Sequence, residues 1–260
     1  MQERHKNRAL YFKELAITSK KFFIPYIERF YKLKPGDEVL EVGCGDGGNL
    51  LPFAERECNV LGVDISEVRI NDAINYFRDA GAKGNFIASD FFKLKLNKQK
   101  KRYDLVVSND VYEHIIDKRM FLNEIKEILN PGGVFFISFP AWQMPFGGHQ
   151  QISKNKIISH LPFIHLFPNF LYRAIFKLGG EKEDFIKGMM EIKSTRTTIE
   201  QFESLIKEAD YKIINRELYF INPHYETKFG LKPRILSPIL ARIPYIRNFF
   251  TTTCFYLLKR

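Results

Sequence analysis

The chain has 260 residues, 45% of them hydrophobic and 27% charged, which is enough for one large α/β domain with a real core. It contains no stretch of about 18 uninterrupted apolar residues, so we expect no membrane-spanning helix. Its three cysteines form no C-x-x-C pair, which argues against a zinc site or a disulfide framework and fits a reducing cytoplasm.

The formal net charge of +10 is concentrated at the two ends of the chain. Residues 1–34 carry nine basic and three acidic residues, and residues 222–260 carry seven and one. Such ends favour an anionic partner, namely a nucleic acid, a phosphorylated substrate or a membrane surface, although solvated lysines are an equal alternative. The first 21 residues lack the apolar run of a signal peptide. We therefore expect a cytoplasmic protein, with peripheral attachment to the inner membrane face as an open alternative.

Helices and strands are predicted to alternate from the N-terminus to Pro140. In chain order we predict a helix at 5–31 broken at Pro25, a strand at 38–42, a helix at 49–57, a strand at 60–63, a helix at 66–79, a strand at 85–88, a surface loop at 93–102, a strand at 104–107, a helix at 117–129 and a strand at 134–139. This alternation predicts βαβ crossovers and a parallel sheet. Near-continuous apolar runs such as VLEV and VFFISF are typical of strands covered on both faces.

The alternation stops at residue 141, where the first of two insertions begins. We predict an aromatic-rich insertion at 141–196 with a helix at 168–178, then a helix at 198–209, a strand at 211–221, a second insertion at 222–248 and a last strand at 249–258. We expect the insertions to be lids over a substrate site, with a membrane or subunit contact as the alternative. The predicted organisation is one domain over 1–260, with an N-terminal helical segment (1–34), a cofactor-binding half (35–140), the lid insertion (141–196) and a C-terminal part (197–260).

The first strand ends in a glycine-rich turn, V-G-C-G-D-G-G, that leads into a helix. Glycines allow a sharp turn and let a ligand lie against the backbone, and the helix N-terminus adds outward N–H groups. Asp64 ends the next strand, where a carboxylate can accept both hydrogen bonds of a ribose diol. Because Gly43, Gly45 and Gly48 also satisfy the dinucleotide fingerprint G-x-G-x-x-G, this turn alone leaves a nicotinamide-dependent oxidoreductase or a non-catalytic nucleotide-binding module open.

Charge separates these alternatives. Glu41 and Asp46 flank the turn and would repel a pyrophosphate, whereas they favour the ammonium and sulfonium of S-adenosylmethionine. With the blocks that follow in order, the sequence resembles the class I methyltransferase family, closely over 34–140 and more loosely over 197–260. The other blocks are A-S-D-F at 88–91, L-V-V-S-N-D-V-Y-E-H at 105–114 and L-N-P-G-G at 129–133.

The resemblance implies a Rossmann-like, doubly wound, mostly parallel sheet of seven strands with an antiparallel last strand. It also implies S-adenosylmethionine as cofactor and S-adenosylhomocysteine as product. By the same resemblance, Glu41 contacts the methionine part, Asp64 binds the ribose and Ile65 packs on adenine. Asp90 accepts from the adenine amino group, and Phe91 offers a backbone N–H to the adenine ring. The turn residues Gly43, Cys44 and Gly45 lie along the cofactor, and the backbone of Asn109, Asp110 and Val111 flanks its methionine end.

The candidate catalytic residues follow the fourth and fifth strands, because substrates of such folds bind beyond the carboxyl ends of the strands. His114, beside Glu113, can act as a general base, or the two can simply hold their loop in place. His149 follows Gly147-Gly148, which allow the loop to fold over the site and direct the ring inward. Asp110, Glu113 and His114 are also metal-binding residue types. That alternative stays open, and we assign no metal site.

The sequence leaves the acceptor undetermined. We expect a small molecule or a glycan or lipid-linked intermediate, methylated at oxygen, because a histidine base is available. RNA or another nucleic acid is the alternative that the basic ends favour. It is the weaker one, since no N/D-P-P-Y/F block follows the fourth strand and no RNA-binding module is recognisable.

Overall fold

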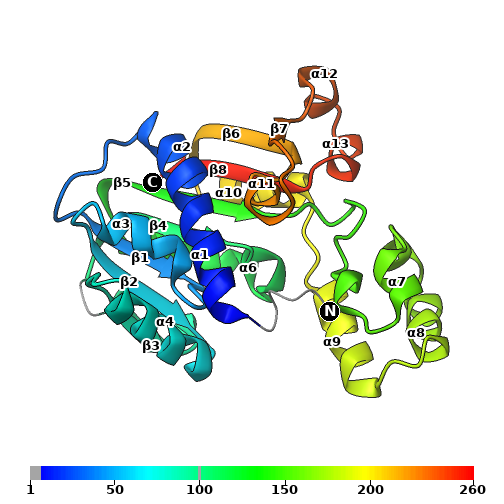
Figure 1. Cartoon of the computed structure of the whole chain (residues 1–260). Coiled ribbons are helices and arrows are strands. Elements are labelled where there is room, and N and C mark those ends of the chain that lie inside the picture. Colours follow the sequence, from blue (N-terminus) through cyan, green and yellow to red (C-terminus); the bar gives the residue numbers. More distant parts are fainter. Residues whose placement is uncertain (1–6, 99–100) are drawn as a thin grey trace.

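One eight-stranded β-sheet forms the framework of the structure, a computed structural model that describes residues 7–98 and 101–260 (Figure 1). The strand order is β3-β2-β1-β4-β5-β8-β6-β7. The strands are β1 (Glu38–Val42), β2 (Asn59–Asp64), β3 (Asn85–Ala88), β4 (Tyr103–Asn109), β5 (Leu129–Phe139), β6 (Lys212–Ile221), β7 (Arg234–Ile235) and β8 (Thr253–Lys259). Strands β1 to β5 are parallel, and β8 is antiparallel to both of its neighbours, β5 and β6. The predicted mostly parallel sheet with an antiparallel last strand is confirmed.

The eighth strand is β7, which the sequence analysis did not predict. It has only two residues, lies within the second insertion and pairs antiparallel with β6. Two residues are too few to produce a hydrophobic alternation, so nothing in the sequence distinguished them from a loop.

The α-helices of the described residues lie on both faces of the sheet and beyond the ends of its strands. They are α1 (Arg8–Thr18), α2 (Ile24–Glu28), α3 (Leu51–Ala54), α4 (Glu67–Asp79), α5 (Phe91–Leu94), α6 (Lys118–Ile128), α7 (Lys156–His160), α8 (Asn169–Leu178), α9 (Glu183–Ser194), α10 (Ile199–Glu208), α11 (His224–Phe229), α12 (Pro238–Ala241) and α13 (Ile246–Phe249). Helices α1 to α4 bury apolar side chains against one face, and α5, α6 and α10 bury theirs against the other. The strands are therefore enclosed between two apolar layers, as their near-continuous apolar runs predicted.

Pro25 was expected to break or kink the N-terminal helix, but the chain stays helical from Arg8 to Glu28 and changes only its hydrogen-bonding pattern before the proline. A π-helical turn, Ser19–Phe23, separates α1 from α2, and Pro25 is the second residue of α2. Proline has no N–H for the helical hydrogen-bond ladder, and the wider turn before it accommodates that loss. The helix ends at Glu28 rather than Tyr31, and its predicted start at His5 lies outside the described residues.

Two predicted element boundaries are wrong for local reasons. The helix after β1 was predicted to reach Glu57, but it is a single 3₁₀ turn followed by the four residues of α3. Pro52 lies in its first turn, and the chain turns away after Ala54. The last strand was predicted to begin at Phe249, yet α13 occupies that position and β8 begins at Thr253.

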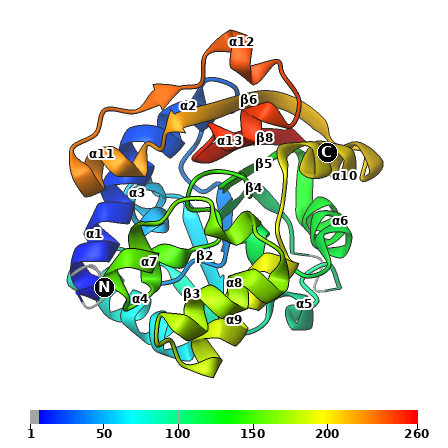
Figure 2. The same ribbon diagram turned by 90° about the vertical axis from the view of Figure 1, so that its right-hand side faces the viewer.

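The first insertion is a small helical unit with its own apolar core. Helices α7, α8 and α9 bury Ile158, Tyr172, Phe176, Ile186 and Met189 among themselves. Only α8 was predicted. Figures 1 and 2 show the three helices beyond the ends of the strands rather than on a face of the sheet. This placement agrees with the expectation of a lid, although closure over a substrate stays a prediction.

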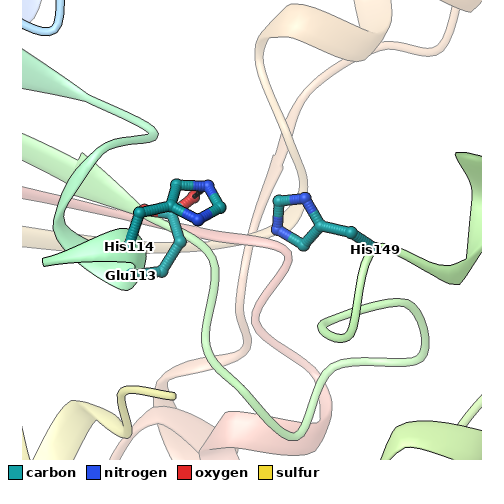
Figure 3. A group of neighbouring side chains, drawn as sticks. All are labelled: Glu113, His114 and His149. Carbon is teal, nitrogen blue, oxygen red and sulfur yellow. Dashed lines mark ion pairs between the residues drawn. The ribbon is translucent and has the colours of Figure 1, made fainter. Parts of the chain in front are cut away.

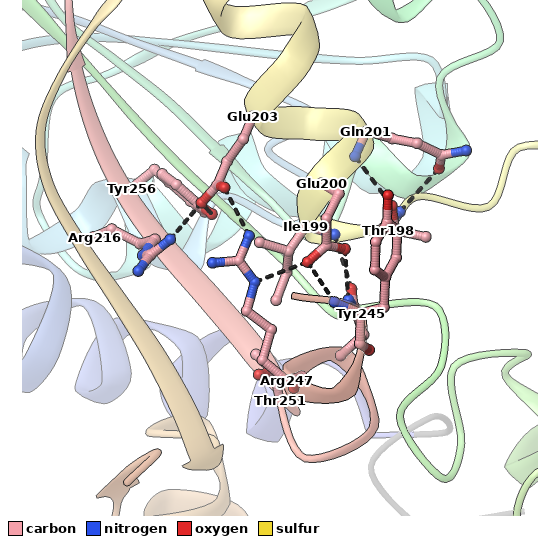
Figure 4. Close-up of polar contacts among 11 residues, drawn as sticks. Thr198, Ile199, Glu200, Gln201, Glu203, Arg216, Tyr245, Arg247, Thr251 and Tyr256 are labelled. Carbon is pink, nitrogen blue, oxygen red and sulfur yellow. Dashed lines mark hydrogen bonds and ion pairs between the residues drawn. The ribbon is translucent and has the colours of Figure 1, made fainter. Parts of the chain in front are cut away.

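The end of the second insertion is attached to α10 by a buried polar network (Figure 4). The guanidinium of Arg247 donates to Glu200 at 2.9 Å and to Glu203 at 2.7 Å, and its side chain is only 7% exposed. Glu203 also accepts from Arg216 and Tyr256 of the adjoining strands. Thr198 caps α10 in a capping box with Gln201. Across 7–98 and 101–260, each helix is too short or too polar to cross a bilayer.

Candidate functional site

A pocket of about 530 Å³ lies where the carboxyl ends of β1, β2, β3 and β4 meet. Parallel strands present their ends at one edge of the sheet, which is where ligands of such folds bind. Ten of the eleven predicted cofactor-binding residues line the pocket. They are Gly43, Cys44, Gly45, Asp64, Ile65, Asp90, Phe91, Asn109, Asp110 and Val111. The structure thus brings together residues up to 68 positions apart, while their contact with a cofactor stays a prediction.

The glycine turn forms the floor of the pocket. Gly43 and Gly45 have φ angles of +74° and +53°, which residues with a Cβ rarely adopt. A Cβ on Gly43 would lie 2.2 Å from a methyl carbon of Val111, and one on Gly45 would lie 2.5 Å from the Arg69 guanidinium. The two glycines are therefore required both by the turn and by the close approach of the pocket walls.

Asp64 closes the turn from the end of β2. Its carboxylate accepts from the backbone N–H of Gly45 and of Ser66, both at 2.9 Å, and so fixes its own orientation toward the pocket. Each oxygen keeps a second lone pair for a hydroxyl. The neighbouring Ile65 is 80% exposed and lines the pocket, which is unusual for a large aliphatic side chain and suits contact with a flat apolar ring.

The walls beside the turn come from the ends of β3 and β4. Asp90 caps α5 by accepting from the N–H of Phe92 at 3.0 Å. Asp110 has a φ of +52°, and its enclosure in the pocket raises the pKa of its carboxyl. Asn109 donates to Asp110 at 3.3 Å and accepts from Ser138 of β5. Strand order therefore arranges three carboxylates across the pocket, Asp90 on the β3 side, Asp64 in the middle and Asp110 on the β4 side.

Glu41 does not line this pocket. It is fully buried behind the turn, where one oxygen accepts from Asn49 at 2.8 Å and the other has no hydrogen-bond partner in the described part of the chain. Burial raises its pKa to about 8, so the carboxyl is mostly protonated at pH 7. Asn49 does line the pocket. Glu41 accepts a hydrogen bond from its side chain and so holds Asn49 in position at the pocket wall.

The charge argument drawn from Glu41 and Asp46 needs revision. Glu41 is largely neutral, and Asp46 is buried and paired with Arg69 at 3.2 Å. The negative charge of the pocket comes instead from Asp64, Asp90 and Asp110, against the single guanidinium of Arg69 among its lining residues. This donor set fits a ligand that carries an ammonium, a sulfonium and a ribose diol, and it fits a pyrophosphate poorly.

Several lining residues were missed by the sequence analysis. Tyr11 comes from α1, and Arg69 comes from the first turn of α4, three residues after its cap Ser66. The order of residues along the chain gives no sign that α1 reaches this edge of the sheet. Arg69 had a usable signal, because the first turn of a helix that follows a strand-ending acid must lie beside that acid.

Glu113, His114 and His149 form one group at the β4 side of the pocket (Figure 3). Glu113 and His114 belong to the 3₁₀ turn Tyr112–His114 after β4, and His149 comes from the first insertion. The centroids of the two imidazole rings lie 5.2 Å apart with the ring planes inclined by 75°, and the nearest Glu113 oxygen lies 3.9 Å from Nε2 of His114. His114 also lines the pocket, so this group adjoins the cofactor-binding residues directly.

The two glycines before His149 lie where the backbone packs too closely for a side chain. A Cβ on Gly147 would lie 2.1 Å from the carbonyl oxygen of Trp142, and one on Gly148 would lie 2.2 Å from the His165 side chain. The loop can therefore pack closely enough to present His149, whose φ is +57°. His165 is fully buried, and its Nε2 lies 2.8 Å from the Trp142 carbonyl oxygen, a contact that holds the loop in place.

Burial perturbs the pKa of each member of this group. Desolvation lowers the pKa of His149 to about 4 and also lowers that of His114, so both rings are neutral at pH 7. Desolvation, with the nearby Asp110 carboxylate, raises the pKa of Glu113. Perturbed groups gathered beside a pocket are typical of a functional site.

Comparison with known proteins gives a matching family model, a set of curated relatives and a set of similar solved structures. A family model described as a methyltransferase domain matches residues 14–177. The ubiquinone biosynthesis O-methyltransferase of Rickettsia canadensis is 34% identical over 101 residues, 39% of this chain and 42% of the relative. The enzyme of the same name from Coxiella burnetii is 32% identical over 115 residues, 44% of this chain and 48% of the relative. The chain thus spans less than half the length of the curated relatives it matches.

Solved structures support the fold over nearly the whole chain. An S-adenosylmethionine-dependent methyltransferase from Clostridium acetobutylicum superposes with a TM-score of 0.57 at 15% identity, covering 93% of this chain and 90% of that one. The magnesium protoporphyrin IX methyltransferase of Synechocystis, solved with bound S-adenosylhomocysteine, has a TM-score of 0.54 at 14% identity, covering 97% and 84%. None of these matches supports the nicotinamide-dependent alternative.

Proposed function

Because this chain belongs to the methyltransferase domain family and uses S-adenosylmethionine, we propose that it methylates a hydroxyl oxygen of a small molecule beside His114 and His149. The observation that carries this proposal is the position of His114. Its ring belongs both to the pocket lining and to the group formed with Glu113 and His149. Groups that bind or deprotonate a hydroxyl therefore stand at one end of the cofactor pocket.

The residues of the pocket imply an orientation for the cofactor. Asp90 and Phe91 on the β3 side suit an adenine, Asp64 suits the ribose hydroxyls, and the backbone around Asp110 on the β4 side suits the methionine end. When bound, the cofactor supplies a methyl group already activated by its sulfonium. The contribution of this chain is to hold that end beside the His114 side of the pocket, to exclude water with the first insertion and to align the acceptor.

Oxygen is proposed as the acceptor atom for two reasons. The curated relatives are named O-methyltransferases, and they match 39–44% of this chain. The group at the end of the pocket also consists of a carboxyl and two imidazoles, which suit a hydroxyl that must lose its proton during transfer.

A lipid-linked acceptor is the second candidate, and contact between the insertions favours it. The ring of Phe163 in the first insertion lies 6.3 Å from that of Phe249 in the second, and both are partly exposed. Other large apolar side chains are exposed on the same two segments, among them Phe167, Phe170, Ile239 and Ile246. Such a surface suits a long apolar substrate or a bilayer.

A nucleic-acid acceptor has less support than the basic ends suggested. In the N-terminal segment, Arg8 pairs with Asp72, Lys20 with Glu55 and Arg29 with Glu217, so part of its positive charge is neutralised within the chain. Glycan acceptors are neither favoured nor opposed by any particular contact.

Transfer of an isotopically labelled methyl group tests the proposal. The protein is incubated with ¹³C-methyl S-adenosylmethionine and cell extract, and the aqueous small-molecule, lipid and RNA pools are separated and examined by NMR. We expect a methoxy signal in the small-molecule pool, or in the lipid pool for the second candidate. Asp64→Ala should abolish it, whereas Asp79→Ala, a change of an exposed acid on α4, should not. Label in RNA, or on nitrogen or carbon, would contradict O-methylation of a small molecule.

A further inference from the structure

Glu113 is a buried acid without a hydrogen-bond partner in the part of the chain that the structure describes. Its side chain is only 7% exposed, and neither carboxyl oxygen accepts a hydrogen bond from the described residues. Lys118, whose charge acts on Glu113, donates instead to the carbonyl oxygens of Ile115 and Thr195, at 2.6 and 2.7 Å. A buried carboxyl left in this state is unfavourable, and an unsatisfied buried polar group often marks the place of an ion or ligand.

The geometry around Glu113 suits one cation. Three potential ligand atoms, one carboxylate oxygen and one nitrogen from each imidazole, lie within 4.8 Å of one another in Glu113, His114 and His149. Around a cation with bonds of about 2.0–2.2 Å, ligand atoms lie roughly 3–4.3 Å apart, so small side-chain rotations bring the three into range. In Figure 3 the two rings point toward a common centre from segments on opposite sides.

The residue types select the kind of cation. Two imidazoles and one carboxylate form the set that holds catalytic zinc or non-haem iron, and three protein ligands leave coordination positions for substrate oxygen. Magnesium and calcium prefer oxygen ligands throughout and fit less well. Asp110, which the sequence grouped with Glu113 and His114, is not one of the three converging residues, and His149 takes that place.

We propose that Glu113, His114 and His149 bind one divalent transition-metal cation whose open positions hold the acceptor oxygen. The inference deepens the proposed O-methylation and rests on it for the role of the cation, but not for its binding. A cation at this position lowers the pKa of a coordinated hydroxyl, whose proton leaves to water as the oxygen takes the methyl group. It also joins the first insertion to the β4 end of the pocket, so the site is complete only when the insertion is in place.

Binding of Zn²⁺ to the chelator-treated full-length protein tests the site without any cofactor or acceptor. By calorimetry we expect one equivalent to bind the wild type, and His149→Ala and Glu113→Gln to weaken binding by at least about 10–100-fold. His160→Ala removes an exposed histidine of the same insertion and is the matched control, for which we expect wild-type affinity. Unchanged affinity in His149→Ala, or no stoichiometric binding to folded wild type, would overturn the proposal.

Anomalous diffraction from wild-type crystals soaked with Mn²⁺ covers the case in which a variant fails to fold. We expect one peak between the three side chains, and occupancy only elsewhere would refute the site. The two proposals can fail separately. Cation binding without any O-methylated product leaves the metal site standing and removes the proposed function. O-methylation by chelator-treated protein that binds no Zn²⁺ leaves the proposed function standing and removes the metal site.

Discussion

Replacing Glu41 with glutamine should stabilise the cofactor-free protein. Glu41 is fully buried, and its pKa is raised from 4.5 to about 8, so folding forces the side chain to take up a proton at pH 7. The 2.5 pH units between 4.5 and 7, at about 1.4 kcal/mol each, give an unfavourable contribution of about 3 kcal/mol. An amide keeps the acceptor for Asn49 and cannot ionise, so Glu41→Gln removes this contribution.

The pH dependence of the gain follows from the same shift. Below pH 4.5 the carboxyl is protonated in both folded and unfolded chains, and the variant should have no advantage. Between pH 4.5 and about 8 the wild type should lose about 1.4 kcal/mol per pH unit relative to the variant, and above pH 8 the difference should become constant. The stabilisation is thus largest in alkaline solution and disappears in acid.

Urea unfolding of both proteins at pH 5, 7 and 8.5 measures this difference. Glu191→Gln, a change of an exposed acid on α9, serves as the control and should alter the free energy of unfolding by no more than about 0.5 kcal/mol. A wild type as stable as Glu41→Gln at pH 7, or a difference that does not change with pH, would refute the buried, protonated state of this acid.

Three further substitutions test other parts of the account. Gly43→Ala should lower the affinity for S-adenosylmethionine at least about tenfold by calorimetry, because the new Cβ collides with Val111 of the pocket wall. Its control, Gly81→Ala, has open space around the new Cβ and should lower only the stability of the fold, by about 1–3 kcal/mol of backbone strain. His149→Ala should reduce turnover and leave cofactor affinity unchanged, and equal turnover would make it only a loop residue. Arg247→Ala should destabilise the chain by about 1.5–3 kcal/mol in urea, since it removes charged hydrogen bonds to Glu200 and Glu203, which keep their other partners, and a loss below about 1 kcal/mol would contradict that role.

Signals confined to short stretches of sequence predicted most of the fold and the floor of the pocket. The turn at Gly43 and Gly45 was recognisable because positive φ angles demand glycine, and Asp64 was recognisable because it ends an apolar run. The parallel direction of β1 to β5 followed from the alternation of predicted strands and helices. The loop of His149 was singled out because consecutive glycines beside a polar ring are unusual.

What the sequence did not provide depends on contacts between distant segments. The ionisation of Glu41 is set by burial, which residue type does not reveal, and the pairing of Asp46 with Arg69 joins positions 23 residues apart. The small core of the first insertion was also missed, because α7 is one turn long. Helix α9 did carry a signal, with Glu183 and Asp184 in its first turn and Lys193 in its last, as the helix dipole favours.

The orientation of the cofactor in the pocket is the claim on which the proposed O-methylation depends. A crystal structure with S-adenosylhomocysteine tests it directly. We predict the adenine between Ile65 and Phe91, the ribose on Asp64 and the sulfur toward His114. An adenine at the His114 end, or a ligand bound outside this pocket, would contradict the account.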